Sequence, residues 1–325
     1  MKRWLNLLLQ VVSVILFILI VWLGGEQPWR EVMAGDIRLV AAAFLLSGFS
    51  QLILGFRLQQ LTRAINGPTP ADWRDYFQVT MTSRGMSLIL PRGVSIFGVK
   101  SVALKALGVP LVRAVWIVFV DKAYDLGYLT LIGIPGVFYL RGELTSSQFL
   151  FLAISLTLIA AAVLWWSIHQ GILRRVVDGL GKLPKIGRLF RSGEESGGAL
   201  LPTETAGLYA FVLTVLHSLV VATSFFLIAR SLDLPHPWLL YGASFPLNQI
   251  SLVLAVAPGG LGISDVSWAA LLALASRPEA EITTFVIGQR VYITVFVLIW
   301  WGASGLMTLL RRRTAILTSA SPLSK

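Results

Sequence analysis

Apolar runs about twenty residues long recur along this chain, and they constrain its fold more than any other feature. A helix needs ~20 apolar residues to cross the ~30 Å hydrocarbon core of a bilayer. Such runs cover residues 4–23, 37–56, 114–140, 149–168, 206–229 and 282–310. Because only 13% of the 325 residues are charged, we expect most of the chain to lie in the membrane. The pattern predicts one all-α, polytopic membrane helical bundle over residues 1–325, with about seven full spans.

A moderately apolar stretch, at about 73–107, is interrupted at Pro91-Arg92-Gly93. Its start is typical of a helix N-terminus, with Thr69 as the N-cap and Pro70 at the first helical position. Each half is too short for a full crossing. We therefore interpret the stretch as a re-entrant helical hairpin whose tip is at Pro91.

The second interrupted stretch, at about 238–276, carries the run Pro258-Gly259-Gly260-Leu261-Gly262. Glycine permits positive φ and exposes backbone amides. A new helix is expected near Val266, with Ser264 or Asp265 as its cap. Irregular backbone at membrane depth survives only where it is buried in protein or lines a wet cavity. This stretch is accordingly predicted to form a second re-entrant hairpin beside a binding site.

The two hairpins share their spacings. The separation from Pro70 to Pro91 equals that from Pro237 to Pro258. The separation from Pro110 to Lys122 likewise equals that from Pro278 to Arg290. Because these spacings occur in the same order in both halves of the chain, they indicate a duplicated unit, with repeat one at about 37–140 and repeat two at about 206–310. Since the first hairpin enters from the cytoplasm and the second from outside, the repeats would be inverted. Ordinary full crossings with proline kinks are the alternative.

The net charge of +11 is better explained by membrane orientation than by nucleic-acid binding. With both termini in the cytoplasm, most Lys and Arg residues fall inside, among them Arg57, Lys100 and the basic loop at about 169–205. Cytoplasmic loops carry such an excess of basic residues. The loop is expected either to contact an anionic lipid surface or only to set the topology.

Charged residues inside the membrane segments are the first candidates for a site, because such charges usually face a cavity or a partner. Arg92 could hold a lipid phosphate or pair with an acid, and Lys122 adds positive charge. Asp121 and Asp125 share a helix face and would repel unless a cation or proton intervenes. We expect Asp125 to pair with Arg92 or Arg290. Either aspartate could carry a coupling ion.

In the second half, Arg290 is the predicted second headgroup cation and Gln289 its hydrogen-bonding neighbour. The backbone of Gly259, Gly260 and Gly262 would allow close approach of the substrate. Asp265 would act as a helix cap or contact the ligand. Three more polar residues would line the cavity or bond between helices, namely His217, Asn248 and Gln249.

Composition argues against several classes of protein. The chain has no cysteine and three scattered histidines, so no disulfide, thiolate metal site or histidine metal cluster is expected. No Ser/His/Asp arrangement can be argued from spacing. We expect no enzyme activity, no cofactor, no metal and no nucleic-acid partner.

The run Pro258-Gly259-Gly260-Leu261-Gly262, the acid three residues later and Gln289-Arg290 resemble the lysylphosphatidylglycerol synthase transmembrane region, a flippase-like family of prokaryotic inner membranes. Leu90-Pro91-Arg92-Gly93 and the segment from Asp121 to Asp125 look like its first-half signature. Asp265 stands where the family usually has glutamate, and the acid expected soon after Pro91 is missing. No soluble aminoacyl-transfer domain is recognisable in this sequence.

The resemblance implies lipid translocation in the inner membrane and not lysine transfer. The expected substrate is a phospholipid or polyprenyl-linked lipid with an anionic or zwitterionic headgroup, bound in a polar cavity between the two hairpins. Two other classes stay open: a non-transporting scaffold or regulator of a lipid- or glycan-modifying enzyme, and an intramembrane enzyme that acts on lipid, against which the composition argues. A homo-oligomer is compatible with each of these functions.

Overall fold

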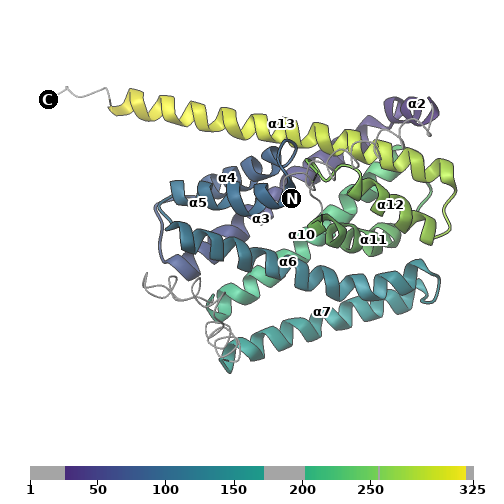
Figure 1. Cartoon of the computed structure of the whole chain (residues 1–325), viewed down its shortest axis with the longest axis horizontal. Coiled ribbons are helices and arrows are strands. Elements are labelled where there is room, and N and C mark those ends of the chain that lie inside the picture. Colours follow the sequence, from purple (N-terminus) through teal and green to yellow (C-terminus); the bar gives the residue numbers. More distant parts are fainter. Residues whose placement is uncertain (1–25, 172–201, 255–256, 320–325) are drawn as a thin grey trace, which may run out of the picture.

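The computed structural model describes residues 26–171, 202–254 and 257–319, and nearly all of these residues lie in helices (Figure 1). The predicted first span at 4–23 and most of the basic loop at 169–205 lie outside the described residues. The described part confirms an all-helical bundle. It contains no strand, only an isolated bridge between Pro91 and Pro258.

Four described helices are long and apolar enough to cross a membrane, as expected of a multi-pass membrane protein. They are α3 (Ile37–Asn66), α7 (Ser146–His169), α10 (Glu204–Ser231) and α13 (Glu279–Ser319). A fifth long helix, α6 (Leu111–Leu140), is not one of the four, and it carries several charged residues in its N-terminal half. The number of seven spans stays a prediction.

Two long helices extend past the ends predicted from hydropathy. Helix α3 continues beyond Phe56 and Arg57 to Asn66, and α13 continues beyond Arg311 to Ser319. Arg57 does not end α3 because acidic side chains neutralise it inside the bundle. In α13 the arginines are good helix formers, so a helix that leaves the hydrocarbon has no local reason to stop at them.

The first interrupted stretch forms α4 (Trp73–Met86), the π-helical turn η1 (Val94–Val99) and α5 (Lys100–Ala106). The N-cap of α4 is Asp72 and not Thr69 as predicted. The Asp72 carboxylate accepts from the amides of Arg74 and Asp75, and Asp75 accepts from the Asp72 amide. This reciprocal capping box satisfies several free amides at once. The hydroxyl of Thr69 is instead bonded to Tyr76 at 2.8 Å.

The second interrupted stretch forms α11 (Trp238–Ser251), the short η2 (Leu252–Leu254) and α12 (Ile263–Leu274). Helix α12 begins at Ile263, earlier than the predicted start near Val266. Its N-cap is Gly262, and Asp265 completes the cap from the third helical position by accepting the Gly262 amide at 3.0 Å. The prediction that Ser264 or Asp265 is the N-cap residue was therefore wrong.

The break between α11 and α12 needs its glycines. Gly259, Gly260 and Gly262 have φ values of 64°, 68° and 76°. This left-handed region is open to glycine and strained for most other residues. The glycine-rich run thus makes a tight reversal that a chain with side chains there could not make without strain.

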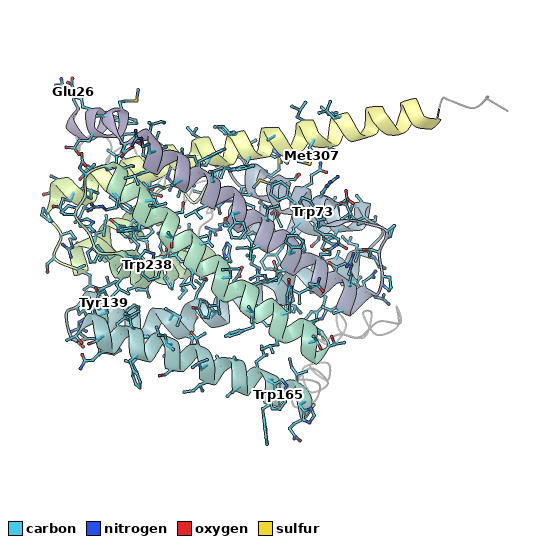
Figure 2. The ribbon with its side chains drawn as sticks, turned by 180° about the vertical axis from the view of Figure 1, so that it is seen from behind. Glu26, Trp73, Tyr139, Trp165, Trp238 and Met307 are labelled. Carbon is cyan, nitrogen blue, oxygen red and sulfur yellow. The ribbon has the colours of Figure 1, made fainter. Side chains whose placement is uncertain are left out.

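The two breaks meet inside the bundle. We call residues 87–93 the first tip and residues 257–262 the second tip. Pro91 and Pro258 form the antiparallel bridge, and the Gly259 amide donates to the Ser87 carbonyl at 2.5 Å. In Figure 1 the α4–α5 pair and the α11–α12 pair lie on opposite sides of the bundle. Figure 2 shows α3 and α10 running side by side past them.

Each short-helix pair has its own apolar core. One cluster packs α4 and α5 against α3 and α6, with Leu58, Tyr76 and Leu104 fully buried. The other packs α11 and α12 against α10 and α13 around Tyr241 and Trp268, which are also fully buried. These two cores hold the pairs as separate units, and polar side chains lie in the space between them.

Candidate functional site

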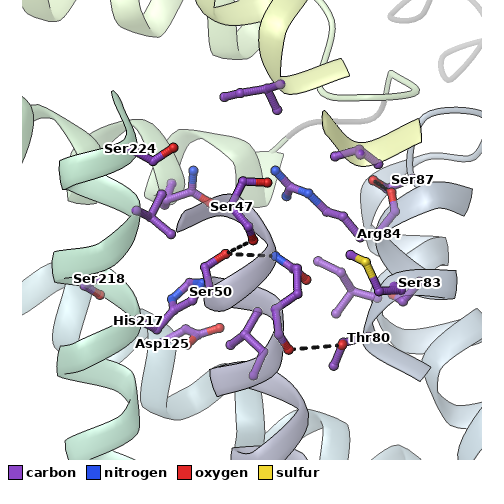
Figure 3. A pocket seen from close by; sticks show the side chains of 18 of the residues that line it. Ser47, Ser50, Thr80, Ser83, Arg84, Ser87, Asp125, His217, Ser218 and Ser224 are labelled. Carbon is purple, nitrogen blue, oxygen red and sulfur yellow. Dashed lines mark hydrogen bonds between the residues drawn. The ribbon is translucent and has the colours of Figure 1, made fainter. Parts of the chain in front are cut away.

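A cavity of about 140 Å³ lies between the two short-helix pairs, with its walls built mainly from α3, α4, α6, α10, α11 and α13 (Figure 3). A cavity needs roughly 10–15 Å³ to hold one water molecule. This one can therefore hold a phosphate-sized group together with water. Its polar lining comprises Ser47, Ser50, Gln51, Thr80, Ser83, Arg84, Ser87, Arg92, Lys100, Lys122, Asp125, His217, Ser218, Ser224 and Gln249.

Serine hydroxyls cover much of the wall on α3 and α4. Ser47 and Ser50 share one face of α3, and Ser83 and Ser87 share one face of α4, because residues three or four apart on a helix are neighbours. Ser50 donates to the Ser47 carbonyl at 2.7 Å, and Ser87 donates to the Arg84 carbonyl at 2.6 Å. The hydroxyl oxygens keep lone pairs for water or a ligand.

Arg84 extends its guanidinium from α4 toward the middle of this cavity (Figure 3). Unlike the other cations here, it has no hydrogen bond or ion pair to any described residue. Its electrostatic neighbours include the like-charged Arg92 and Arg290 and the imidazole of His217. The sequence signal was a lone basic residue in a moderately apolar helix, and it did not single out Arg84 as a site residue.

Arg92 lies in the cavity wall at the first tip. Its Nη2 donates to Gln249 Oε1 of α11 at 2.7 Å, so a neutral amide is its partner. This contact joins the first tip to the second short-helix pair. Arg92 forms no ion pair with an acid of the described residues, although Asp125 lies close enough to interact with its charge.

A buried charge network lies below the cavity. Arg57 Nε donates to Asp121 Oδ1 at 2.8 Å, and Arg57 Nη1 donates to Asp125 Oδ1 at 2.5 Å. Lys100 Nζ lies 2.7 Å from the second oxygen of Asp121. Lys122 Nζ lies 2.5 Å from Asp125 Oδ2. A cation does intervene between the two aspartates, as their shared face requires.

The predicted partner of Asp125 was wrong. Its carboxylate pairs with Arg57 and Lys122, and not with Arg92 or Arg290. Arg57 and Lys100 were both expected on the cytoplasmic side, whereas their side chains are 0% and 5% exposed inside the network. The reason is the length of α3, which places Arg57 well before the end of the helix.

A second ion pair fastens the second tip to α13. Arg290 Nη2 lies 2.7 Å from both oxygens of Asp265, and Arg290 Nη1 donates to the Gly259 carbonyl at 2.9 Å. Gln289 Nε2 adds a 3.4 Å contact to Asp265. We call this set the tip latch. A bidentate arginine–carboxylate pair fixes geometry as well as charge.

The predicted site residues thus fall into two groups. Arg92, Lys122 and Asp125 line the cavity, and Asp121 lies behind Asp125 in the charge network. The others do not line it and belong to the second tip or its latch: Gly259, Gly260, Gly262, Asp265, Gln289 and Arg290.

Three further polar residues had been expected either in the cavity or in bonds between helices. His217 and Gln249 line the cavity. Asn248 instead donates to the Ser264 carbonyl at 3.0 Å and bonds α11 to α12. The pair Asn248-Gln249 therefore divides its roles, one residue holding the second short-helix pair together and the other facing the site.

The chemistry of the cavity is that of an anion-binding pocket. Arg84 and Arg92 bring ten N–H donors between them, because each guanidinium carries five. In the described part of the chain, no group of three or more His, Asp or Glu side chains could hold a metal ion. The arrangement can bind and orient an anionic group.

Comparison with known proteins identifies one family. Its description is the lysylphosphatidylglycerol synthase TM region, and it matches residues 8–300. The matched part includes both tips, the charge network, the tip latch and every cavity residue named above. No curated protein matches the chain.

Proposed function

The chain belongs to the lysylphosphatidylglycerol synthase transmembrane-region family, and from that premise we propose that it is a lipid transporter of flippase type. The substrate is a phospholipid or polyprenyl-linked lipid. Its anionic or zwitterionic headgroup enters the cavity while its acyl chains stay in the bilayer. Arg84, Arg92 and Lys122 supply positive charge to the headgroup.

The observation that carries this proposal is the guanidinium of Arg84, which has no partner among the described residues and lies in a polar cavity inside an apolar bundle. A charge at the bilayer centre costs ~2.5–3.5 kcal/mol on insertion scales, and such residues mark substrate and ion pathways. A chain that served only as a scaffold would gain nothing from holding Arg84 there. A transporter would use it each time a headgroup entered.

The proposed mechanism has two inverted repeats that rock against each other. Each short-helix pair is tied to the long helix that follows it by an ion pair, Lys100–Asp121 in one half and Asp265–Arg290 in the other. This correspondence supports a duplicated unit with re-entrant hairpins. Inverted repeats of broken helices commonly enclose a site at the midplane and alternate its access. The bonds between the tips would break and reform in each cycle.

Asp121 and Asp125 remain our candidates for carrying a coupling proton. Each carboxylate is bound by two cations, so protonation requires that at least one cation first moves away. Lys122, whose side chain is 23% exposed, is the cation with the most freedom to do so. We place the protein in a prokaryotic inner membrane with both termini in the cytoplasm, as the positive-inside rule favours.

The test is reconstitution into liposomes that contain lipids with a fluorescent acyl chain and different headgroups. Dithionite then quenches only the outer leaflet, so transport appears as additional quenching. We expect at least one anionic lipid to be moved faster than in protein-free liposomes. The variant Arg84→Gln/Arg92→Gln should lose this acceleration.

The matched control is Arg141→Gln, which removes an exposed arginine at the far end of α6 whose partner is Glu143. It should transport at the wild-type rate. Failure to accelerate any lipid, or full activity of the double variant, would contradict the proposal. A scaffold predicts instead that the basic loop at 169–205 is essential and that the cavity cations are dispensable.

A further inference from the structure

Positive charge exceeds negative charge around the cavity. Four of its lining residues are basic, and the single acid among them is Asp125; the basic residues are Arg84, Arg92, Lys100 and Lys122. Behind the lining, Arg57 and Asp121 cancel each other, as do Arg290 and Asp265. With His217 counted as neutral, the described residues leave three positive charges without a counter-charge.

The excess is not spread evenly. Lys100 and Lys122 each have an aspartate within 2.7 Å, so most of their charge is compensated locally. Arg92 bonds only to the neutral Gln249, and Arg84 bonds to no described residue. The uncompensated charge is therefore concentrated on the two guanidinium groups beside the first tip. The charge network adds one further positive charge below them, because it holds three cations and two carboxylates.

An uncompensated charge in a low-dielectric interior is costly, and proteins normally pair or hydrate it. A singly charged headgroup would leave two of the three positive charges uncompensated. A zwitterionic headgroup would in addition bring an amine toward like charges. A phosphomonoester carries about −1.5 to −2 at pH 7 and three strong acceptor oxygens, and a diphosphate carries at least as much charge.

On this ground we infer that the cavity selects a phosphate group that is at least doubly charged, a phosphomonoester or a diphosphate, over a phosphodiester. The inference rests on the proposed transport function and names the headgroup class that this function uses. Arg84 binds the phosphate through its guanidinium fork, which matches phosphate geometry. Arg92 exchanges its bond to Gln249 for a second phosphate oxygen. Lys122 stands next to the site as the third cation.

Binding can be tested separately from transport. The purified protein would be titrated with three lipids of identical acyl chains, namely phosphatidic acid, phosphatidylglycerol and phosphatidylcholine, with tryptophan fluorescence and thermal shift as readouts. Trp300 lines the cavity and would report occupancy. We expect phosphatidic acid to bind at least 10-fold more tightly than phosphatidylglycerol at pH 7.5, and phosphatidylcholine not to bind. The preference should shrink below about pH 6, where the phosphomonoester dianion takes up a proton and becomes singly charged.

Arg84→Gln should remove the preference for phosphatidic acid, while the exposed control Arg141→Gln should keep it. Arg84→Lys keeps the charge without the fork, and it should retain part of the preference. If Arg84→Gln does not yield folded protein, the preference for phosphatidic acid over phosphatidylglycerol is compared between Arg84→Lys and the wild type, and a reduced preference in Arg84→Lys supports the inference. Equal affinity for phosphatidic acid and phosphatidylglycerol, or an unchanged preference in these Arg84 variants, would overturn the inference.

Soluble anions separate a lipid headgroup from a free phosphate. Glycerol 3-phosphate and inorganic phosphate should bind at least 10-fold more weakly than phosphatidic acid, since they lack acyl chains. Equal binding would overturn the assignment to a lipid. A preference for phosphatidic acid without transport of any lipid would contradict the proposed function alone. Transport with no preference for the phosphomonoester would contradict only this inference.

Discussion

Arg57 Nη2 lies 2.7 Å from Asp121 Oδ1, and neither side chain is exposed. This ion pair joins α3 to α6 and anchors the charge network below the cavity. Removing one partner of a buried pair leaves an uncompensated charge and typically costs about 3–5 kcal/mol. We predict that Arg57→Gln lowers the stability of the protein by this amount, measured by thermal unfolding in detergent.

The control for that variant is Glu143→Gln, which breaks the exposed Arg141–Glu143 pair at the end of α6. Exposed pairs contribute about 0–1 kcal/mol, so this variant should unfold at nearly the same temperature as the wild type. A similar loss in both variants would contradict the role assigned to burial. An Arg57→Gln protein as stable as the wild type would also contradict that role.

Two arginines, Arg290 beside the second tip and Arg84 beside the first, should respond in opposite ways to the same substitution. Arg290→Gln leaves Asp265 buried without its cation and takes a donor from the Gly259 carbonyl, so we predict a loss of about 3–5 kcal/mol. Arg84→Gln removes a cation that has no partner among the described residues and lies near like charges. Its melting temperature without ligand should stay the same or rise.

Such a pattern, in which stability rises as binding is lost, is expected of a functional residue that the fold alone does not need. Melting temperatures of both variants, with and without phosphatidic acid, provide the comparison. A large loss of stability in Arg84→Gln would show that Arg84 has a structural role. The account of the cavity would then be wrong.

Gly48 allows Trp300 to pack against α3 at the wall of the cavity. A Cβ at Gly48 would overlap the Trp300 ring, which stacks on Phe44 at 4.9 Å and donates to its carbonyl at 3.1 Å. Gly48→Ala should therefore cost about 1–3 kcal/mol by overpacking and slow transport. Gly302→Ala is the matched control, because no atom lies within 4 Å of its added Cβ. It should be neutral or slightly stabilising, and equal effects of the two alanines would refute the packing argument.

His236, in the loop between α10 and α11, predicts a pH dependence of stability. It bonds to Tyr241 and to Glu281 of α13, each at 2.7 Å. Burial lowers the pKa of His236, and the Glu281 carboxylate opposes this only in part, with Arg277 also nearby. Because the unfolded chain binds the proton first as pH falls, this contribution to stability is present above about pH 6.5 and lost below it.

The melting temperature should accordingly fall between pH 7.5 and pH 5.5, and His236→Gln should reduce that fall. Pairing of protonated His236 with Glu281 acts in the opposite direction. A melting temperature that rises on acidification, and does so only in the wild type, would show that the ion pair outweighs burial.

Local features of the fold were predictable from sequence where a single residue type dictates the geometry. The glycines of the second tip predicted positive φ, and all three adopt it. The breaks at Pro91 and Pro258 were also predicted, because proline and glycine interrupt helices for local reasons. The need for a cation between Asp121 and Asp125 followed from repulsion on one helix face.

What the sequence could not identify was the partner across the bundle. Arg57 lies 64 residues before Asp121. A span predicted from hydropathy ends at a charged residue, whether or not the folded protein places an acidic partner next to that residue. The choice between Thr69 and Asp72 as N-cap depended on a reciprocal bond that only the folded turn reveals. Arg84 was passed over for a similar reason, since its lack of a partner is a property of the folded cavity.

The proposed rocking of the two repeats requires the two tips to separate during each transport cycle. The chain has no cysteine, so a disulfide in Pro91→Cys/Pro258→Cys would join only the engineered pair. These residues form an antiparallel bridge, and the Cα separation of such pairs, about 4.5–5.5 Å, suits a disulfide. Transport would be measured by albumin back-extraction of a fluorescent lipid, because dithionite would reduce the bond. We predict that oxidation stops transport and that a reductant restores it, while both single-cysteine variants stay active; full transport with the tips cross-linked would contradict the account.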